Sequence, residues 1–116
     1  MIPSGVEIFV GLDPIDLRWG FDRLAGLVEE RIGRKARSGA LFLFFGKRRT
    51  ALKALFYDGT GLCLFYKRLD LGTFRVPEAM EKGATSILVE ERVLEDLLDG
   101  IEVDAPGKVK RVSGVH

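Results

Sequence analysis

Two apolar runs meet at a tight turn near the middle of this chain. Residues 51–57 and 62–68 both read as strands, and the segment Asp58-Gly59-Thr60-Gly61 separates them. This segment is a strong hairpin signal, because glycine accepts the positive φ angles that such turns need. If the two strands fold symmetrically about Gly59 and Thr60, Leu52 lies opposite Lys67. The sequence therefore predicts a hairpin and the approximate pairing of its side chains.

Charge is divided along the chain into blocks of opposite sign. Residues 31–69 contain ten basic side chains and one acidic side chain, whereas residues 1–30 and 70–104 are acidic overall. The net charge of +1 hides this division. Such blocks create an electric field that favours a charged partner, although they do not define a fold.

The hairpin brings cations from two segments to one end of the predicted sheet. Residues 47–49 lie at the end far from the turn, beside residues 67–68, and Lys53 is expected opposite Tyr66. Cations with neighbouring aromatic side chains are suited to phosphate groups and exposed bases. We therefore predict a nucleic-acid-binding patch of Lys47, Arg48, Arg49, Lys53, Lys67 and Arg68, extended by Arg34, Lys35 and Arg37.

Other interpretations of the same residues remain open at this point. The basic face could be a solvated surface, or the acidic blocks of the same chain could neutralise it. The aromatic side chains Tyr57, Phe65 and Tyr66 could belong to the core and not to a stacking surface.

The N-terminal part predicts a strand, a helix and a second strand. Residues 6–10 read as a strand. A helix is expected over 14–32, with Asp13 as its N-cap and Pro14 at its first position. The continuous apolar run 40–45 is typical of a strand that is covered on both faces.

The C-terminal part completes an α+β pattern. Residues 73–76 and 86–89 read as short strands, and 90–99 as a second helix. The order of elements predicts an antiparallel β-meander with an N-terminal helix and a C-terminal helix packed on it. We expect one domain over 1–104, followed by a flexible basic tail over 105–116.

Few side chains suit catalysis. The single histidine, His116, is the final residue, and Cys63 lies inside an apolar run where a thiol is unreactive. Zinc-ligand spacing, a P-loop and a dinucleotide-binding motif do not occur. We therefore predict no cofactor and no catalytic residue. The enzymatic alternative is a metal-dependent nuclease using Asp13, Asp16 and Asp58, although capping of a helix and the hairpin turn explain these residues as well.

The sequence also predicts a cytoplasmic protein without a membrane segment. Its apolar runs are interrupted well before the roughly 18 residues that a membrane span needs. The first residues lack the basic and apolar regions of a signal peptide, and a single cysteine agrees with a reducing compartment.

Longer segments of the chain match a known family. Residues 16–22 read DLRWGFD, 38–44 read SGALFLF, and 57–69 read YDGTGLCLFYKRL. GTF at 72–74 and LLDGI at 97–101 follow. In this order over residues 5–103, the chain resembles the TnpB-type accessory protein (Orf2) of the IS66 family of bacterial insertion elements. The resemblance implies a protein that is encoded beside a separate transposase, assists transposition and has no established catalytic residues.

Residues and resemblance together predict a non-catalytic accessory protein of transposition. It is expected to bind DNA at the element ends, the transposase, or both, through the basic patch. Other element-encoded proteins and a second copy of this chain are further expected partners. The main alternative is a protein-interaction or oligomerisation module that does not bind DNA.

Overall fold

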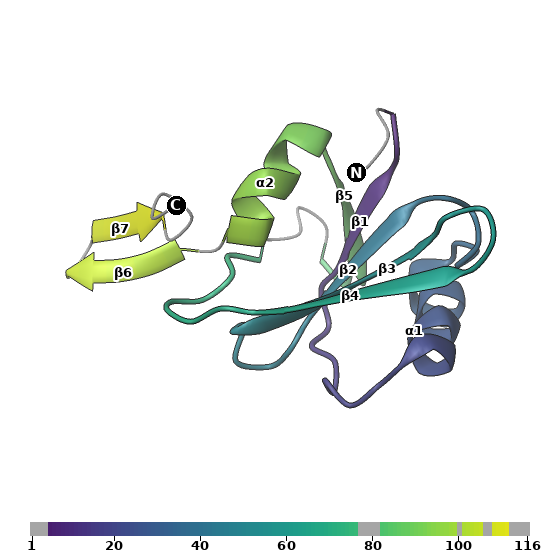
Figure 1. The fold of residues 1–116 in the computed structure, drawn as a ribbon, viewed down its shortest axis with the longest axis horizontal. Coiled ribbons are helices and arrows are strands. Elements are labelled where there is room, and N and C mark those ends of the chain that lie inside the picture. Colours follow the sequence, from purple (N-terminus) through teal and green to yellow (C-terminus); the bar gives the residue numbers. More distant parts are fainter. Residues whose placement is uncertain (1–4, 77–81, 100, 106–107, 112–116) are drawn as a thin grey trace.

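The computed structural model describes residues 5–76, 82–99, 101–105 and 108–111. Its body is a five-stranded sheet with the order β4-β3-β2-β1-β5 (Figure 1). The strands are β1 (Ile8–Gly11), β2 (Leu41–Phe45), β3 (Ala51–Tyr57), β4 (Leu62–Arg68) and β5 (Ser86–Val89). The helices are α1 (Phe21–Leu27), its π-helical continuation η1 (Val28–Ile32) and α2 (Glu91–Asp99). None of the helices in the described part of the chain has the length and the apolar composition of a membrane span.

The α+β class predicted from the sequence is confirmed, with one change in strand pairing. β2, β3 and β4 form the expected antiparallel meander. β1 pairs with β2 in parallel, because α1 and η1 connect the two strands and a parallel pair needs such a crossover. β5 pairs antiparallel with the other side of β1, so the N-terminal strand lies inside the sheet.

The register of the β3–β4 hairpin is the predicted one. Leu52 pairs with Lys67, and Lys53 pairs with Tyr66. In the turn, one carboxylate oxygen of Asp58 accepts hydrogen bonds from the backbone N–H groups of Thr60 at 2.9 Å and Gly61 at 3.0 Å. The local chemistry of the turn is therefore sufficient to set the register of both strands.

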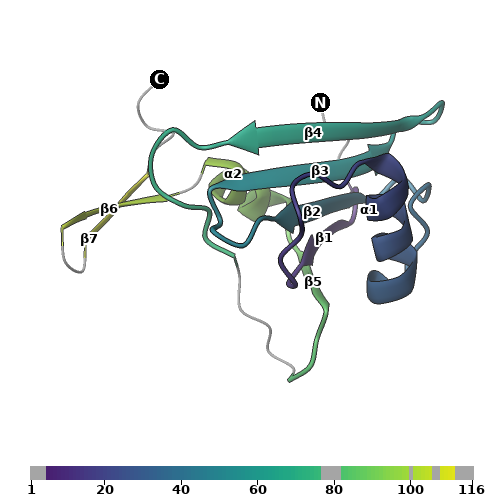
Figure 2. The same cartoon turned by 90° about the horizontal axis from the view of Figure 1, so that it is seen from below.

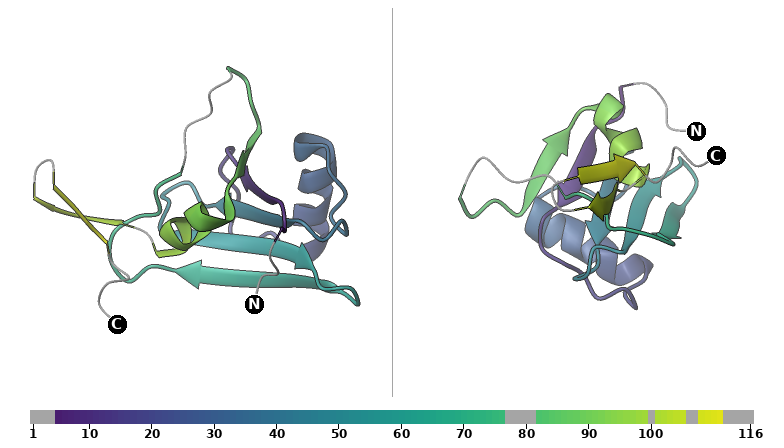
Figure 3. Two further views of the ribbon diagram at one scale, coloured as in Figure 1. Left: turned by 90° about the horizontal axis from the view of Figure 1, so that it is seen from above. Right: turned by 90° about the vertical axis from the view of Figure 1, so that its left-hand side faces the viewer.

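Alternate residues of β2 enter two separate hydrophobic cores. The odd-numbered residues of this strand pack on the face that α2 covers, and the even-numbered residues pack on the face that α1 and η1 cover. Figures 2 and 3 show the two helical layers on opposite sides of the sheet. All five residues of β2 are buried, which explains why its sequence is continuously apolar.

The first helix begins seven residues later than predicted. It starts at Phe21, with Gly20 as its N-cap, and not at Pro14 after Asp13. The backbone N–H of Ile15 donates to the carbonyl of Phe45 at 2.9 Å, so the segment before the helix is tied to the end of β2. This tertiary contact overrides the capping signal of the local sequence.

The C-terminal elements partly differ from the prediction. β5 and α2 match the expected elements over 86–89 and 90–99, but residues 73–76 form no strand. β6 (Ile101–Ala105) and β7 (Lys108–Arg111) form a two-stranded hairpin that projects from the body (Figure 1). β6 runs through residue 104, the expected end of the domain, to Ala105, and residues 112–116 lie outside the described residues. The division into a domain over 1–104 and a flexible tail over 105–116 stays a prediction.

Candidate nucleic-acid interface

The turn between β2 and β3 holds three consecutive cations in a defined backbone conformation. Gly46 donates its N–H to the carbonyl of Ala51 at 3.1 Å, and Arg49 donates its N–H to the carbonyl of Gly46 at 3.0 Å. Arg49 has a φ of 59°, a left-handed conformation that is uncommon for a residue with a side chain. Lys47, Arg48 and Arg49 are all exposed. Backbone hydrogen bonds therefore hold the turn that carries these three exposed cations.

Two further segments bring cations to the same end of the sheet. Arg68 pairs with Ala51 in the β3–β4 ladder, directly beside the turn. Phe74 donates its backbone N–H to the carbonyl of Arg49 at 2.7 Å, and this contact brings Arg75 to the site. Arg75 was missed from the sequence, because it lies in the block 70–104, which is acidic overall, and no local pattern predicts the return of residue 74 to residue 49.

We call the exposed cations at this end of the sheet the basic turn surface, which consists of Lys47, Arg48, Arg49, Arg68 and Arg75. Ion pairs within the described part of the chain involve other cations, namely Arg18, Arg31 and Arg92. Asp70 is the only acidic residue between positions 59 and 77 and lowers the local net charge by one. The surface remains basic, and among the described residues none of its five cations takes part in an ion pair with the acidic blocks.

Lys53 was predicted to belong to this patch, but the structure buries it. Its side chain is 6% exposed. The ammonium Nζ donates to the backbone carbonyl of Trp19 at 2.7 Å and lies 5.0 Å from the centroid of the Tyr66 ring. The pre-helical segment covers this side chain, so Lys53 fastens that segment to the sheet and does not present a free charge.

Lys67 is also only partly available. It lies on the α2 face of the sheet, and its ammonium Nζ donates to the carbonyl of Leu98 at 2.7 Å. That carbonyl is in the last turn of α2, where orphan acceptors and the negative end of the helix dipole favour a cation. Lys67 therefore caps the C-terminus of α2 from the edge of the basic turn surface.

Arg34, Lys35 and Arg37 do not extend the basic turn surface. They precede β2, whereas residues 47–49 follow it, so the two groups lie at opposite ends of this strand. Arg34 stacks its guanidinium over the Phe9 ring at 5.0 Å, and Arg37 lines a groove beside Tyr57. The expectation of one continuous patch failed because the covered, fully extended β2 separates these segments.

Two of the three aromatic side chains considered at the patch are exposed. Phe65 is 43% exposed and Tyr66 is 47% exposed, on opposite faces of β4. Arg68 Nη2 lies 3.4 Å from the Tyr66 hydroxyl, so Tyr66 borders the basic turn surface. Tyr57 is at the other end of the hairpin, and its hydroxyl donates to the carbonyl of Gly59 at 2.8 Å.

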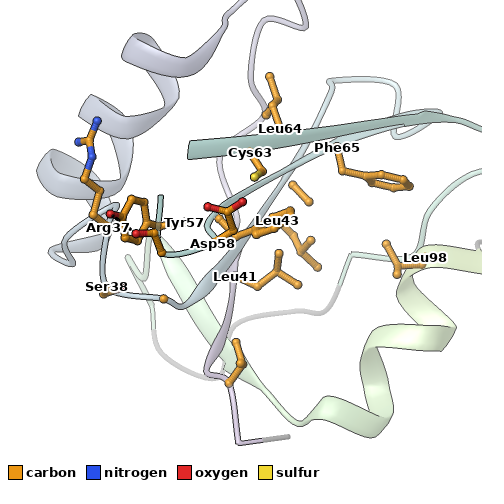
Figure 4. Close-up of a pocket in the computed structure, with 15 residues that line it drawn as sticks. Arg37, Ser38, Leu41, Leu43, Tyr57, Asp58, Cys63, Leu64, Phe65 and Leu98 are labelled. Atoms are coloured by element: carbon orange, nitrogen blue, oxygen red, sulfur yellow. Dashed lines mark hydrogen bonds between the residues drawn. The ribbon is translucent and has the colours of Figure 1, made fainter. Parts of the chain in front are cut away.

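An apolar groove of about 800 Å³ lies on the α2 face of the sheet (Figure 4). Leu41, Leu43, Phe65 and Leu98 are among its lining residues. Cys63 also lines the groove, and burial raises the pKa of its thiol, so the reactive thiolate is disfavoured there. The groove is formed largely by hydrocarbon and contains no convergent set of catalytic groups among the described residues.

The three carboxylates of the nuclease alternative are not brought together. Asp13 accepts from Arg31 at 2.8 Å. The side chain of Arg18 holds the pKa of Asp16 at about 2, and the backbone N–H groups of the hairpin turn hold the pKa of Asp58 at about 2. Asp58 is at the opposite end of the sheet from the segment of Asp13 and Asp16. Within the described ranges, no group of three His, Cys, Asp or Glu residues is placed to hold a metal ion.

Comparisons with known proteins place this chain in a family. The family model described as IS66 Orf2-like protein matches residues 6–108. Protein y4hO of Sinorhizobium fredii is 39% identical over 117 residues, which cover 99% of each chain. Protein y4jC of the same organism is 33% identical over 87 residues, which cover 75% of this chain and 74% of the relative. Both relatives are described as uncharacterised.

No solved structure gives a significant match to this chain. The family assignment therefore comes from sequence, and it agrees with the resemblance in the segments 16–22 and 57–69. The protein belongs to the IS66 Orf2-like family of insertion-element accessory proteins.

Proposed function

We propose that this accessory protein assists transposition by binding the phosphate backbone of DNA through the basic turn surface. This proposal rests on one observation: five exposed cations from three chain segments lie together at one end of the sheet. Cations of this kind displace the counterions of DNA phosphates, which supplies affinity without sequence recognition. Transposase binding remains the second arm of the proposal, since an acidic protein surface could use the same cations.

The backbone conformation of Arg49 supports a role for this turn. A left-handed residue is usually glycine, because other residues pay a steric cost there. The chain has an arginine at this position, and hydrogen bonds to Gly46 and from Phe74 hold its peptide groups. Strained residues of this kind tend to occur where function requires a fixed side chain.

Salt dependence of DNA binding tests the proposal. Affinity is measured for a duplex with the terminal sequence of the element and for an unrelated duplex of equal length. If three or four phosphates are contacted, log K should fall against log salt with a slope of about −2.7 to −3.6. Arg48→Ala should reduce the magnitude of this slope by about 1 on both duplexes, because one phosphate contact is lost.

Arg37→Ala is the matched control for that measurement. It removes the same charge from an exposed position at the opposite end of β2. The proposal requires Arg37→Ala to leave the slope unchanged. It is refuted if the parent shows no salt dependence, or if the two variants weaken binding equally. Binding to the transposase with the same Arg48 dependence and no DNA binding would instead favour the protein-partner arm.

A further inference from the structure

Among the described residues, the outer edge of β4 is unpaired, and its charged residues, Lys67 and Arg68, are confined to one end of the strand. β4 is the last strand of the sheet, and Figure 2 shows no described element beyond it. It is seven residues long, its pairing with β3 has no bulge, and it contains no proline. No residue of β4 is fully buried. Native proteins usually shorten, bend or charge such edges, because a free edge pairs readily with another strand.

The hydrogen-bond pattern of the hairpin identifies the free backbone groups. Asp58 donates its N–H to the carbonyl of Gly61 at 3.1 Å, and Leu69 donates its N–H to the carbonyl of Thr50 at 2.9 Å. Hydrogen-bonded pairs alternate along an antiparallel ladder, so residues 63, 65 and 67 direct their backbone groups toward β3. Residues 62, 64, 66 and 68 therefore direct theirs toward the free edge.

From this edge we infer that two copies of the protein form a dimer by antiparallel pairing of β4 with β4. A two-fold axis beside Phe65 pairs residue 64 of one copy with residue 66 of the other, and residue 62 with residue 68. This register lets every outward residue of one strand meet an outward residue of its partner. If one strand moves by one residue along the other, its outward-directed backbone groups lie opposite residues whose own groups point toward β3. The inference concerns self-association and does not depend on DNA binding.

Side chains along the edge favour the same arrangement. The two Phe65 rings, 43% exposed in a single copy, face each other in a pair where side chains are closest. Phe65 lines the apolar groove in each copy (Figure 4), so contact between the two rings would join the two grooves. On the other face, the half-exposed Tyr66 ring packs against Leu64 of the second copy, an aromatic–aliphatic pair that stabilises sheets.

Charge complementarity fixes the antiparallel direction. The basic residues of β4 are at its C-terminal end, and the carboxylate of Asp58 sits over the turn at its N-terminal end. Antiparallel pairing brings Arg68 of each copy to the Asp58 turn of the other. Parallel pairing would place the two Arg68 side chains together, which disfavours it.

The first measurement is the mass in solution by light scattering. A single chain is 12.9 kDa, and the inference expects twice this mass for the parent at micromolar concentration. Phe65→Glu and Phe65→Lys should each give the single-chain mass, because like charges then face each other at the axis. Phe65 is exposed in the single copy, so both variants are expected to fold, which circular dichroism checks.

Mixing separates an interface effect from general damage. An equimolar mixture of Phe65→Glu and Phe65→Lys should regain the dimer mass, because opposite charges then meet at the axis. A parent of single-chain mass overturns the inference. A dimeric parent whose two variants stay monomeric on mixing also overturns it, since the dimer would then use another register or surface.

Cysteine cross-linking tests the register itself. In a Cys63→Ser background, Phe65→Cys should form a disulfide on mild oxidation, because directly opposite residues have Cα atoms about 4.5 Å apart. Tyr66→Cys is the control, since its equivalent in the second copy lies two residues along the strand and beyond disulfide reach. Equal cross-linking of the two variants contradicts the proposed register.

Discussion

Replacing Arg49 by glycine should stabilise the fold while it weakens DNA binding. The φ of 59° places Arg49 in the left-handed region, which costs a residue with a side chain roughly 1 to 2 kcal/mol. Glycine avoids this cost but makes the unfolded chain more flexible, which removes about 0.4 to 1 kcal/mol of the stability gained. We therefore expect Arg49→Gly to raise the free energy of unfolding by about 0.5 to 1 kcal/mol, and the Tm by about 2 to 5 °C.

The matched control is Arg48→Gly in the same turn. This change removes the same side chain and the same charge from the neighbouring exposed position. Among the described residues, Arg49 is the only one other than glycine with a positive φ, so Arg48 has no such strain to relieve. Arg48→Gly should lower the free energy of unfolding by about 0.4 to 1 kcal/mol, through the unfolded chain alone.

Urea unfolding of the two variants provides the assay. A change in the midpoint with an unchanged slope reports stability and not a change in compactness. The two substitutions should shift the midpoint in opposite directions, while both reduce DNA affinity by a similar factor. If both variants shift the midpoint in the same direction, the reasoning from the left-handed conformation is wrong.

Three further predictions concern the fold around the site. Gly11→Ala should lower the free energy of unfolding by about 1 to 3 kcal/mol, because its Cβ would lie 2.9 Å from the buried Phe44 ring. Gly26→Ala, in open helical space, should raise it by about 0.5 to 1 kcal/mol, and urea unfolding measures both changes. Asp58 has a pKa of about 2 against an ordinary 3.8, so its contribution to stability is complete above about pH 4 and is lost as the pH falls toward 2. Asp58→Asn should therefore reduce the dependence of the free energy of unfolding on pH in this range. An unchanged pH dependence would contradict the stabilising role of the Asp58 carboxylate. Lys53→Met should lower the free energy of unfolding, measured in urea, by about 1 to 3 kcal/mol, because the Trp19 carbonyl loses its donor. The salt slope of DNA binding should stay unchanged, whereas loss of a lysine that contacts phosphate would reduce it.

Local sequence was sufficient for the hairpin and for part of the site. The glycines of the 58–61 turn and the two flanking strands are contiguous, so the register and the meeting of residues 47–49 with Arg68 follow from nearby residues. The continuous apolar character of β2 likewise predicted its burial on both faces. These features depend on short-range geometry, which sequence patterns describe well.

The parts that could not be predicted depend on contacts between distant segments. Lys53 is buried because Trp19, 34 residues earlier, places its carbonyl over the strand. Arg75 joins the basic turn surface only through the hydrogen bond between Phe74 and Arg49. The late start of α1 follows from the contact of Ile15 with Phe45. Each contact has a backbone carbonyl of a distant residue as its acceptor, and a carbonyl carries no signal in the identity of its residue.

The inner position of β1 has a consequence for the order of events during synthesis. Its two neighbouring strands occupy residues 41–45 and 86–89, so the ribosome must release three quarters of the chain before both edges of β1 can pair. Until then Ile8 and Val10, fully enclosed in the finished fold, belong to an open apolar strand. A chain that stopped ahead of Ser86 would lack β5 and leave one edge of β1 unpaired, and an open apolar edge of this kind favours aggregation.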